Sequence, residues 1–189
     1  MVVRAEAAAE TRRRILNAAN QVAYERIDLD SVTLDEVAKR AGVTTMTVVR
    51  HFGGKNRLLE DLQRAERRRV MASRQVAPGD ITEATRVLYD HYEQLGDWGI
   101  RAQARELVEP NLRHYLNRAR MGHRKWVLET FAPQLKRLHA AKRRMVVDAL
   151  IVATDVLTWK VLYRDMGRPR PKAEATVQLM IEAIVRRAG

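Results

Sequence analysis

The chain has 189 residues, a length that suits one large domain or two small ones. Hydrophobic residues make up 46% of it, and a formal net charge of +12 suits a polyanionic partner without choosing DNA over RNA or a membrane. The absence of cysteine excludes disulfides and thiolate-bound zinc. No apolar run reaches the roughly 18 residues that span a bilayer, and no signal-peptide pattern opens the chain. We therefore expect a cytoplasmic protein without a membrane partner.

Residues 1–10 lack an apolar stripe, which predicts a flexible arm before a helix that begins near Thr11 and ends near Arg26. The stripe of this helix consists of Ile15, Ala18, Ala19 and Val22. Its first turn holds three arginines at residues 12–14, although the helix dipole disfavours cations there. Contacts with a nucleic-acid backbone and a solvated arm explain these arginines equally well. Residues 27–32 are predicted to form a loop.

Residues 33–54 carry the pattern of two short helices joined by a tight turn. Thr33 and Glu36 have the spacing of a capping box, and a period-3.6 apolar stripe follows. That stripe consists of Leu34, Val37, Ala38 and Ala41. Gly42 can end the first helix, Thr44 can cap the second, and residues 53–54, both glycine, can stop it. This spacing is typical of a helix-turn-helix, whose second helix enters the DNA major groove.

The predicted second helix leaves a polar face outward. Val48 and Phe52, four residues apart, can face the core. The residues left for solvent or a partner are Thr44, Thr45, Met46, Thr47, Arg50 and His51. Hydroxyl groups suit phosphate oxygens, an apolar group suits a thymine methyl, and an arginine suits a guanine edge. The sequence therefore predicts a DNA-reading helix.

The same residues resemble the N-terminal domain of tetracycline-repressor (TetR) family regulators. The resemblance is carried by TLDEVAKRAGVT at 33–44, TVVRHF at 47–52 and KNRLL at 55–59; with RILNAA at 14–19 it covers roughly residues 11–62. It implies an all-α homodimeric repressor with a three-helix DNA-binding domain and a C-terminal helical bundle for ligand binding and dimerisation. The operator it implies is double-stranded DNA, in the form of an inverted repeat.

The resemblance also implies roles for individual residues. The positions that match phosphate contacts are Thr33, Thr44, Thr47, His51 and Lys55. The positions where base contacts are expected are Thr45, Met46 and Arg50. The chain departs from the family at Val49, where tyrosine is common, and at Met46, where a small residue is frequent. The first departure removes a phosphate-binding hydroxyl, and the second changes base readout.

Residues 55–77 are predicted to form a connecting helix, whose first residue, Lys55, can clamp a phosphate at the helix N-terminus. If this helix links two domains, it can also transmit a conformational change from a bound ligand to the DNA-binding domain. Residues 78–80, Pro-Gly-Asp, mark a boundary. The predicted organisation is therefore an arm at 1–10, a DNA-binding domain at 11–54, a connecting helix at 55–77, and a ligand-binding and dimerisation domain at 78–189.

The second half is predicted to be helical throughout. Its expected helices cover residues 81–95, 100–109, 111–131, 144–166 and 173–188, with glycines interrupting at 96–99 and a basic stretch at 136–144 that lies on the surface or leads into the next helix. The helix at 144–166 is apolar around most of its circumference, so it should be buried on more than one face. With the last helix it can form a four-helix bundle with a second copy or a hairpin within one chain. The resemblance favours the dimer, and the residues expected there are Leu150, Leu157, Val161, Val177, Met180, Ile181 and Ile184.

Aromatic residues of the second half can line a pocket for a small apolar or amphipathic effector. The candidates are Tyr89, Tyr92, Trp98, Trp126 and Trp159, each of which ordinary core packing explains as well. Three arginines and one histidine could meet an acidic ligand, although solvation explains them too: Arg113, Arg120, Arg124 and His123. No catalytic motif, metal-ligand spacing or cofactor signature is present, so no enzyme, metal or cofactor is expected. The alternatives to an effector-released repressor are an effector-independent DNA-binding regulator and a basic helical scaffold protein.

Overall fold

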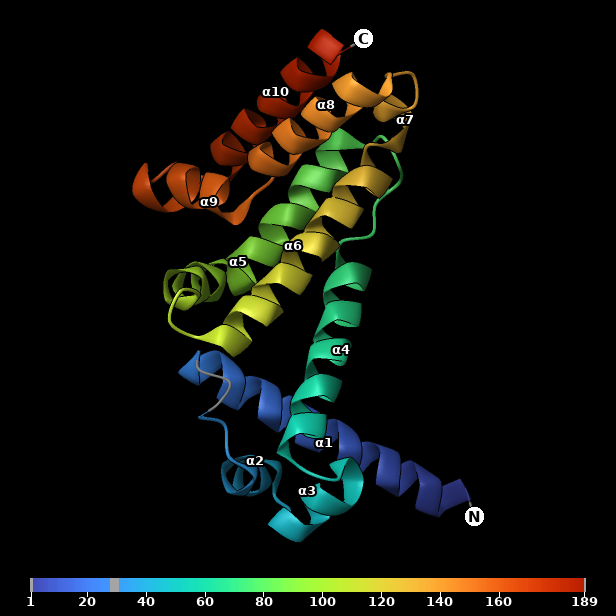
Figure 1. Cartoon of the computed structure of the whole chain (residues 1–189), viewed down its shortest axis with the longest axis vertical. Coiled ribbons are helices and arrows are strands. Elements are labelled where there is room, and N and C mark those ends of the chain that lie inside the picture. The colour runs from blue at the N-terminus through green and yellow to red at the C-terminus, as the bar shows by residue number, and fades with distance from the viewer. Residues whose placement is uncertain (1, 28–30, 189) are drawn as a thin grey trace. The chain divides into compact units, whose positions relative to one another are not determined.

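The computed structural model describes residues 2–27 and 31–188, and every regular element within these ranges is a helix (Figure 1). The predicted all-α class is confirmed. The chain divides into two compact units, Met1–Arg68 with Arg105–Tyr115 and Arg69–Ala104 with Leu116–Gly189. The predicted loop at 27–32 lies partly outside the described residues, and the four predicted domain ranges remain predictions.

The first unit contains α1 (Val2–Arg26), α2 (Leu34–Ala41), α3 (Thr45–Phe52) and most of α4 (Lys55–Ser73). Its core is aliphatic apart from Phe52, and the predicted stripe of α1 is fully part of it. The predicted start of this helix near Thr11 is wrong, because α1 begins at Val2. Alanine-rich sequence has a high helix propensity, so residues 5–10 stay helical although they are exposed.

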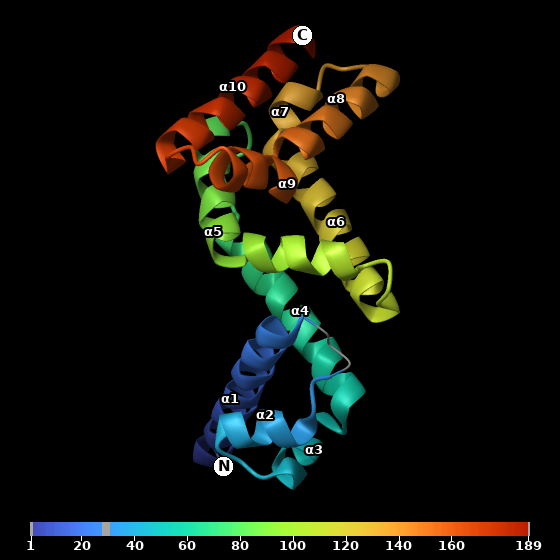
Figure 2. The ribbon, with the colours of Figure 1, turned by 90° about the vertical axis from the view of Figure 1, so that its left-hand side faces the viewer.

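The second unit contains the end of α4 and a set of helices that follow it. These are α5 (Ile81–Arg105, whose last residue belongs to the first unit), α6 (Pro110–Thr130, from Leu116 onward), α7 (Ala132–Leu135), α8 (Ala140–Ala153), α9 (Val156–Trp159), the π-helix η1 (Lys160–Asp165) and α10 (Arg170–Ala188). Helices α8 and α10 lie side by side in both views (Figures 1 and 2). None of the described helices combines the length and the apolarity needed to cross a membrane.

Helix α5 corrects the predicted interruption at residues 96–99. The helix continues from Ile81 to Arg105, and its ribbon bends partway along (Figure 2). Gly96 serves the packing of a neighbour, because a Cβ atom there would lie 2.6 Å from Cζ3 of Trp159. A glycine inside a helix costs only about 1 kcal/mol relative to alanine, so the helix can continue through it.

The predicted helix at 144–166 is interrupted, and this prediction is wrong. Helix α8 begins earlier, at Ala140 after the N-cap His139, and it ends at Ala153. The Thr154 hydroxyl donates to the Leu150 carbonyl at 2.7 Å, and the Asp155 carboxylate accepts the Leu157 N–H at 2.8 Å. Asp155 is therefore an N-cap inside an apolar run, and it restarts the chain as α9 and η1.

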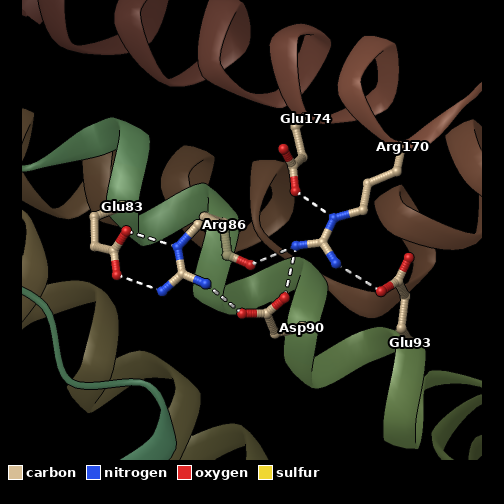
Figure 3. Close-up of polar contacts among 6 residues, drawn as sticks. All are labelled: Glu83, Arg86, Asp90, Glu93, Arg170 and Glu174. Carbon is tan, nitrogen blue, oxygen red and sulfur yellow. Dashed lines mark hydrogen bonds and ion pairs between the residues drawn. The ribbon is translucent and has the colours of Figure 1, made fainter.

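A network of ion pairs joins α10 to α5 (Figure 3). The Arg170 guanidinium donates to Asp90 at 2.6 Å, Glu93 at 2.7 Å and Glu174 at 2.7 Å. Partial burial disfavours the charged form, but the hydrogen bonds and charges of these carboxylates together outweigh it and raise the pKa of Arg170. Asp90 also accepts from Arg86, so the network continues along α5. Arg170 thus has three carboxylate partners.

Candidate nucleic-acid interface

The turn between α2 and α3 has the predicted capping geometry. The Thr33 hydroxyl accepts the Glu36 N–H at 3.2 Å and so caps α2. Gly42 has φ 65° and ψ 41°, the left-handed conformation that glycine adopts without a Cβ clash. The Val43 N–H then donates to the Ala38 carbonyl at 3.0 Å, which closes the end of the helix. The two helices therefore meet through a turn of defined shape.

The arginines at the start of the predicted first helix are engaged within the protein. Arg14 donates from Nη2 to the Ala41 carbonyl at 2.6 Å and to the Gly42 carbonyl at 3.2 Å, so it satisfies the end of α2. Arg12 pairs with Asp61, and its guanidinium lies 4.8 Å from the Phe52 ring centre. Arg13 pairs with Glu10 at 2.7 Å. At least two of these arginines help to hold the three-helix unit together.

Helix α3 turns its apolar residues inward and its candidate DNA contacts outward. Val48 and Phe52 are buried in the first core, as predicted. Met46 is 73% exposed, Arg50 is exposed, and His51 is half-buried. Because Val48 and Phe52 fix the rotation of the helix, residues 46 and 50 are held on its outer side.

The threonines of α3 form short-range hydrogen bonds. The Thr44 hydroxyl accepts the Thr47 N–H at 3.2 Å and lies 2.9 Å from the Thr47 hydroxyl. The Thr45 hydroxyl donates to the Asp35 carboxylate at 2.5 Å. Sequence reasoning missed this role of Asp35, for which a carboxylate in the first turn of α2 was the only signal. Thr45 is therefore oriented from α2, and its hydroxyl already has an acceptor.

Lys55 is the first residue of α4 and follows two glycines with positive φ, 77° at Gly53 and 149° at Gly54. These conformations reverse the chain after α3 and bring the α4 N-terminus next to its end. All eight predicted DNA contacts belong to the first unit. They lie at the starts of α2, α3 and α4 or within α3: Thr33, Thr44, Thr45, Met46, Thr47, Arg50, His51 and Lys55.

The five predicted aromatic ligand residues belong to the second unit, as do the predicted dimer residues, whereas Arg113, a candidate for an acidic ligand, belongs to the first. Tyr89, Tyr92, Trp126 and Trp159 are buried in its core, and Trp98 is half-buried. Three of the predicted dimer residues are covered by the chain itself, namely Leu150, Val177 and Ile181. Leu157 and Val161 are 47% and 48% exposed, and Met180 and Ile184 are partly buried. The sequence pattern did not separate the core side from the outer side of these helices.

The geometry of the first unit defines a helix-turn-helix DNA-binding domain. Residues 15–62 match the family model of bacterial regulatory proteins of the tetR family. Solved structures share the fold of the whole chain. A tetR-family transcriptional regulator from Streptomyces coelicolor is 17% identical with a TM-score of 0.66, and the match covers 95% of this chain and 88% of that one.

Two structures from Rhodococcus give the same result. A transcriptional regulator from Rhodococcus sp. Rha1 is 20% identical with a TM-score of 0.64, over 93% of this chain and 96% of that chain. A putative TetR-family transcriptional regulator from Rhodococcus sp. is 18% identical with a TM-score of 0.64, over 93% and 99%. No curated protein sequence matches the chain. The chain therefore carries a tetR-family DNA-binding domain at residues 15–62, and it shares its overall fold with the regulators compared above.

Proposed function

We propose that this regulator acts in the cytoplasm as a homodimeric repressor, released from an inverted-repeat operator by a small-molecule effector. The observation that carries DNA reading is the outer face of α3, where Met46 and Arg50 are exposed while Val48 and Phe52 anchor the helix from the opposite side. A helix held in this way presents the same side chains to every DNA site, which sequence-specific reading requires.

On the operator, phosphate contacts set the register and base contacts set the sequence. We assign phosphate contacts to Thr33, Thr44, Thr47, His51 and Lys55, and base contacts to Thr45, Met46 and Arg50. Arg50 is the residue suited to a guanine, whose N7 and O6 accept a bidentate pair. Since the Thr45 hydroxyl is bonded to Asp35, we expect Thr45 to read through its methyl group.

We propose that the dimer forms through exposed apolar residues of the last helices. Leu157 and Val161 are half exposed, and Val152 and Leu179 are 64% exposed each. Apolar groups left in water on neighbouring helices favour association with a second copy. Leu150, Val177 and Ile181 then act as core residues, while Met180 and Ile184 lie at the edge of the contact. A dimer also places two α3 helices on half-sites about one DNA turn apart.

Release requires an effector with different affinities for the DNA-bound and free conformations. The element that can transmit the difference is α4, since its first fourteen residues belong to the first unit and its last five to the second. An effector that acts on the end of α4 would change the placement of Lys55 at its start. A thermal-shift screen without any stabilising compound would favour an effector-independent regulator.

The test is selection of bound duplexes from a random DNA pool at two salt concentrations. We expect an enriched inverted repeat whose spacing gives the distance between the two α3 helices. Enrichment of nothing, with binding lost as salt rises, would leave only charge-driven affinity and would favour the scaffold alternative.

Two variants locate the reading surface on the selected duplex. Lys55→Ala should weaken all sequences alike and lower the salt slope by about one unit. Arg50→Ala should relax discrimination at one base position, by about 1–3 kcal/mol. Lys136→Ala, which removes one exposed charge from the second unit, is the matched control. If Lys55→Ala and Arg50→Ala both bound like the control, the placement of the interface would be wrong.

A further inference from the structure

The second unit holds one arginine inside its core. Arg74 follows α4 and is only 5% exposed. Its guanidinium carbon lies 4.3 Å from the centre of the Trp126 ring, and the Trp126 Nε1–H donates to the Arg74 carbonyl at 2.8 Å. The side chain and the backbone of Arg74 are thus both fixed by the same tryptophan, which belongs to α6.

Arg74 has no carboxylate partner among the described residues. Its Nη2 donates to Nδ1 of His123 at 3.0 Å, while its buried Nε has no acceptor in the described part of the chain. A guanidinium has five N–H donors, and one neutral nitrogen satisfies only one of them. Arg170, which is less buried, has three carboxylates around it in the same unit.

A chain of hydrogen bonds leads away from Arg74. Because Nδ1 of His123 accepts from Arg74, its Nε2 carries the hydrogen and donates to the Thr154 hydroxyl at 3.0 Å. The Thr154 hydroxyl in turn donates to the Leu150 carbonyl, and the Tyr92 hydroxyl donates to the Thr154 carbonyl at 2.8 Å. The bonds from Arg74 through His123 and the Thr154 hydroxyl to Leu150 run in one direction, and they leave His123 neutral.

The charge of Arg74 also acts on a second histidine, His91. Burial, and next the charge of Arg74, lowers the pKa of His91 to about 3. The same two causes, in the same order, lower the pKa of His123 to about 3. The imidazole of His91 lies 5.4 Å from the Tyr92 ring, and that of His123 stacks on Trp126 at 5.7 Å. The region therefore combines positive potential with aromatic surface.

A buried cation without a counter-ion is unfavourable in the protein alone. A bound anion would offset the free-energy cost of desolvating the guanidinium. The anion that fits best is a carboxylate, since its two oxygens match the fork of a guanidinium. The ring of Trp126, which contacts the guanidinium, and that of Tyr92, which packs on Trp159, suit an apolar or aromatic body. A single guanidinium beside two neutral histidines favours one negative charge over two.

We propose that Arg74, with His91 and His123 beside it, binds the carboxylate of a small organic acid with an apolar or aromatic body, and that such an acid is the effector. The assignment rests on the proposed effector-released function. It places the recognition of the acid at the end of α4, the helix whose first residue is Lys55.

Three organic acids, each compared with its primary amide, test the assignment in the chain of 189 residues. The probes are benzoate and benzamide, phenylacetate and phenylacetamide, and hexanoate and hexanamide, at constant ionic strength with sodium chloride as the reference. Scanning calorimetry should show at least one acid raising Tm by several degrees more than its amide or chloride. Arg74→Met should abolish this rise, and titration calorimetry should show the Kd increasing at least tenfold. Arg137→Gln, an exposed arginine of the same unit, should leave it unchanged.

The assignment would be overturned if no acid of the three exceeded its amide and chloride, or if Arg74→Met kept the rise. Arg74→Met retains an unbranched side chain against Trp126, and without ligand its Tm should lie within a few degrees of the parent. If this variant does not fold, Arg74→Lys decides. It keeps the charge but lacks the fork, so it should weaken the acid at least tenfold, and unchanged binding would overturn the assignment.

The calorimetry involves no DNA, so it separates this assignment from the function on which it rests. Acid binding together with a failed duplex selection would remove the repressor proposal and keep the site. A selected operator together with no acid preference would do the reverse. With both in place, the bound acid should lower operator affinity in the parent and in Arg137→Gln, and should have no effect in Arg74→Met.

Discussion

The cores of the two units are built from different side chains. The first is aliphatic apart from Phe52, and the second combines aromatic rings with polar groups. Among the described residues, all buried polar or charged side chains belong to the second unit: Arg74, Thr85, Thr130 and Thr154. The first unit keeps its hydroxyl and cationic groups on the surface, where DNA can reach them. Its core therefore only has to hold a shape.

Burying a cation lowers the stability of the second unit. An aliphatic replacement at Arg74 would remove the desolvation of a cation, yet the chain has an arginine there. Groups that lower stability and that the fold does not need are typical of ligand sites, because activity and stability are in conflict there. The difference between the two cores agrees with our proposal that one unit serves as a scaffold for DNA contacts and the other binds a small molecule.

Of the changes considered, acid pH should lower the free energy of unfolding most, through the buried groups of the second unit. His91 and His123 are neutral in the folded chain down to a pKa of about 3, whereas in the unfolded chain they take up protons below a pKa of about 6.5. The unfolded state therefore binds more protons in this window, and stability falls as pH drops through it. At about pH 5 the expected loss is roughly 2 kcal/mol per histidine. Tryptophan fluorescence during urea unfolding at pH 7.5 and 5 measures this loss of stability. It reports on the second unit because that unit holds Trp98, Trp126 and Trp159.

His91→Gln should lose about half of this pH dependence, because the replacement cannot be protonated. His114→Gln, an exposed histidine of the first unit, should keep all of it. Equal pH dependence in the two variants would show that His91 takes up its proton at a similar pH in the folded and the unfolded chain. The comparison of the two cores would then lose its electrostatic basis.

Two glycines of α5 test how tightly the second core is packed. A methyl group at Gly96 would lie 2.6 Å from the Trp159 ring, and one at Gly99 would meet nothing within 4 Å. Gly96→Ala should destabilise the protein by about 1–3 kcal/mol because the core is overpacked. Gly99→Ala should stabilise it by up to about 1 kcal/mol through helix propensity. Urea unfolding measures both, and a stabilising Gly96→Ala would mean that Trp159 is free to move.

Removing Arg170 should have a smaller effect that depends on salt. Arg170→Gln leaves Asp90, Glu93 and Glu174 without their shared cation (Figure 3). Partly exposed pairs contribute below about 1 kcal/mol each, so we expect a loss of about 1–2 kcal/mol at low salt and less at high salt. Urea unfolding at two salt concentrations measures it. A loss independent of salt would instead indicate that the buried stem of Arg170 contributes through packing.

Local chemistry in the sequence predicted the first unit well. Thr33, Gly42, Thr44 and Gly53 act within a few residues of themselves, so their capping and turn roles could be inferred from spacing alone. The rotation of α3 followed from Val48 and Phe52 for the same reason. The start of α1 was missed because an alanine-rich run gives no stop signal, and only the structure places the helix start at Val2.

The second unit was harder because its contacts are distant in sequence. Arg74 and His123 are 49 residues apart, and Gly96 and Trp159 are 63 apart, so no local pattern joins them. His123 was a candidate for an acidic ligand, but Arg74 was not, since a lone arginine after a charge run suggests a solvated face. Asp155 was overlooked inside an apolar run, although aspartate before an apolar segment is an N-cap signal.

The last and smallest effect separates stability from DNA contact in the first unit. The Thr33 hydroxyl caps α2 and is exposed, so it can serve the fold and a phosphate at once. Thr33→Ala should lower stability by about 1 kcal/mol and weaken DNA binding. Thr33→Asp keeps a capping oxygen and favours the helix dipole, so its stability should match the parent, but its charge repels phosphate.

The discriminating measurement is therefore urea unfolding and operator affinity on the same two variants, with Thr33→Ser as the control that keeps both roles. Aspartate should weaken the operator more than alanine does, although it leaves the more stable protein. If affinity instead followed stability across the three variants, Thr33 would act on DNA only through the position of α2. The outer face of the first unit would then be narrower than the one we propose, with α3 and the start of α4 remaining as its contacts.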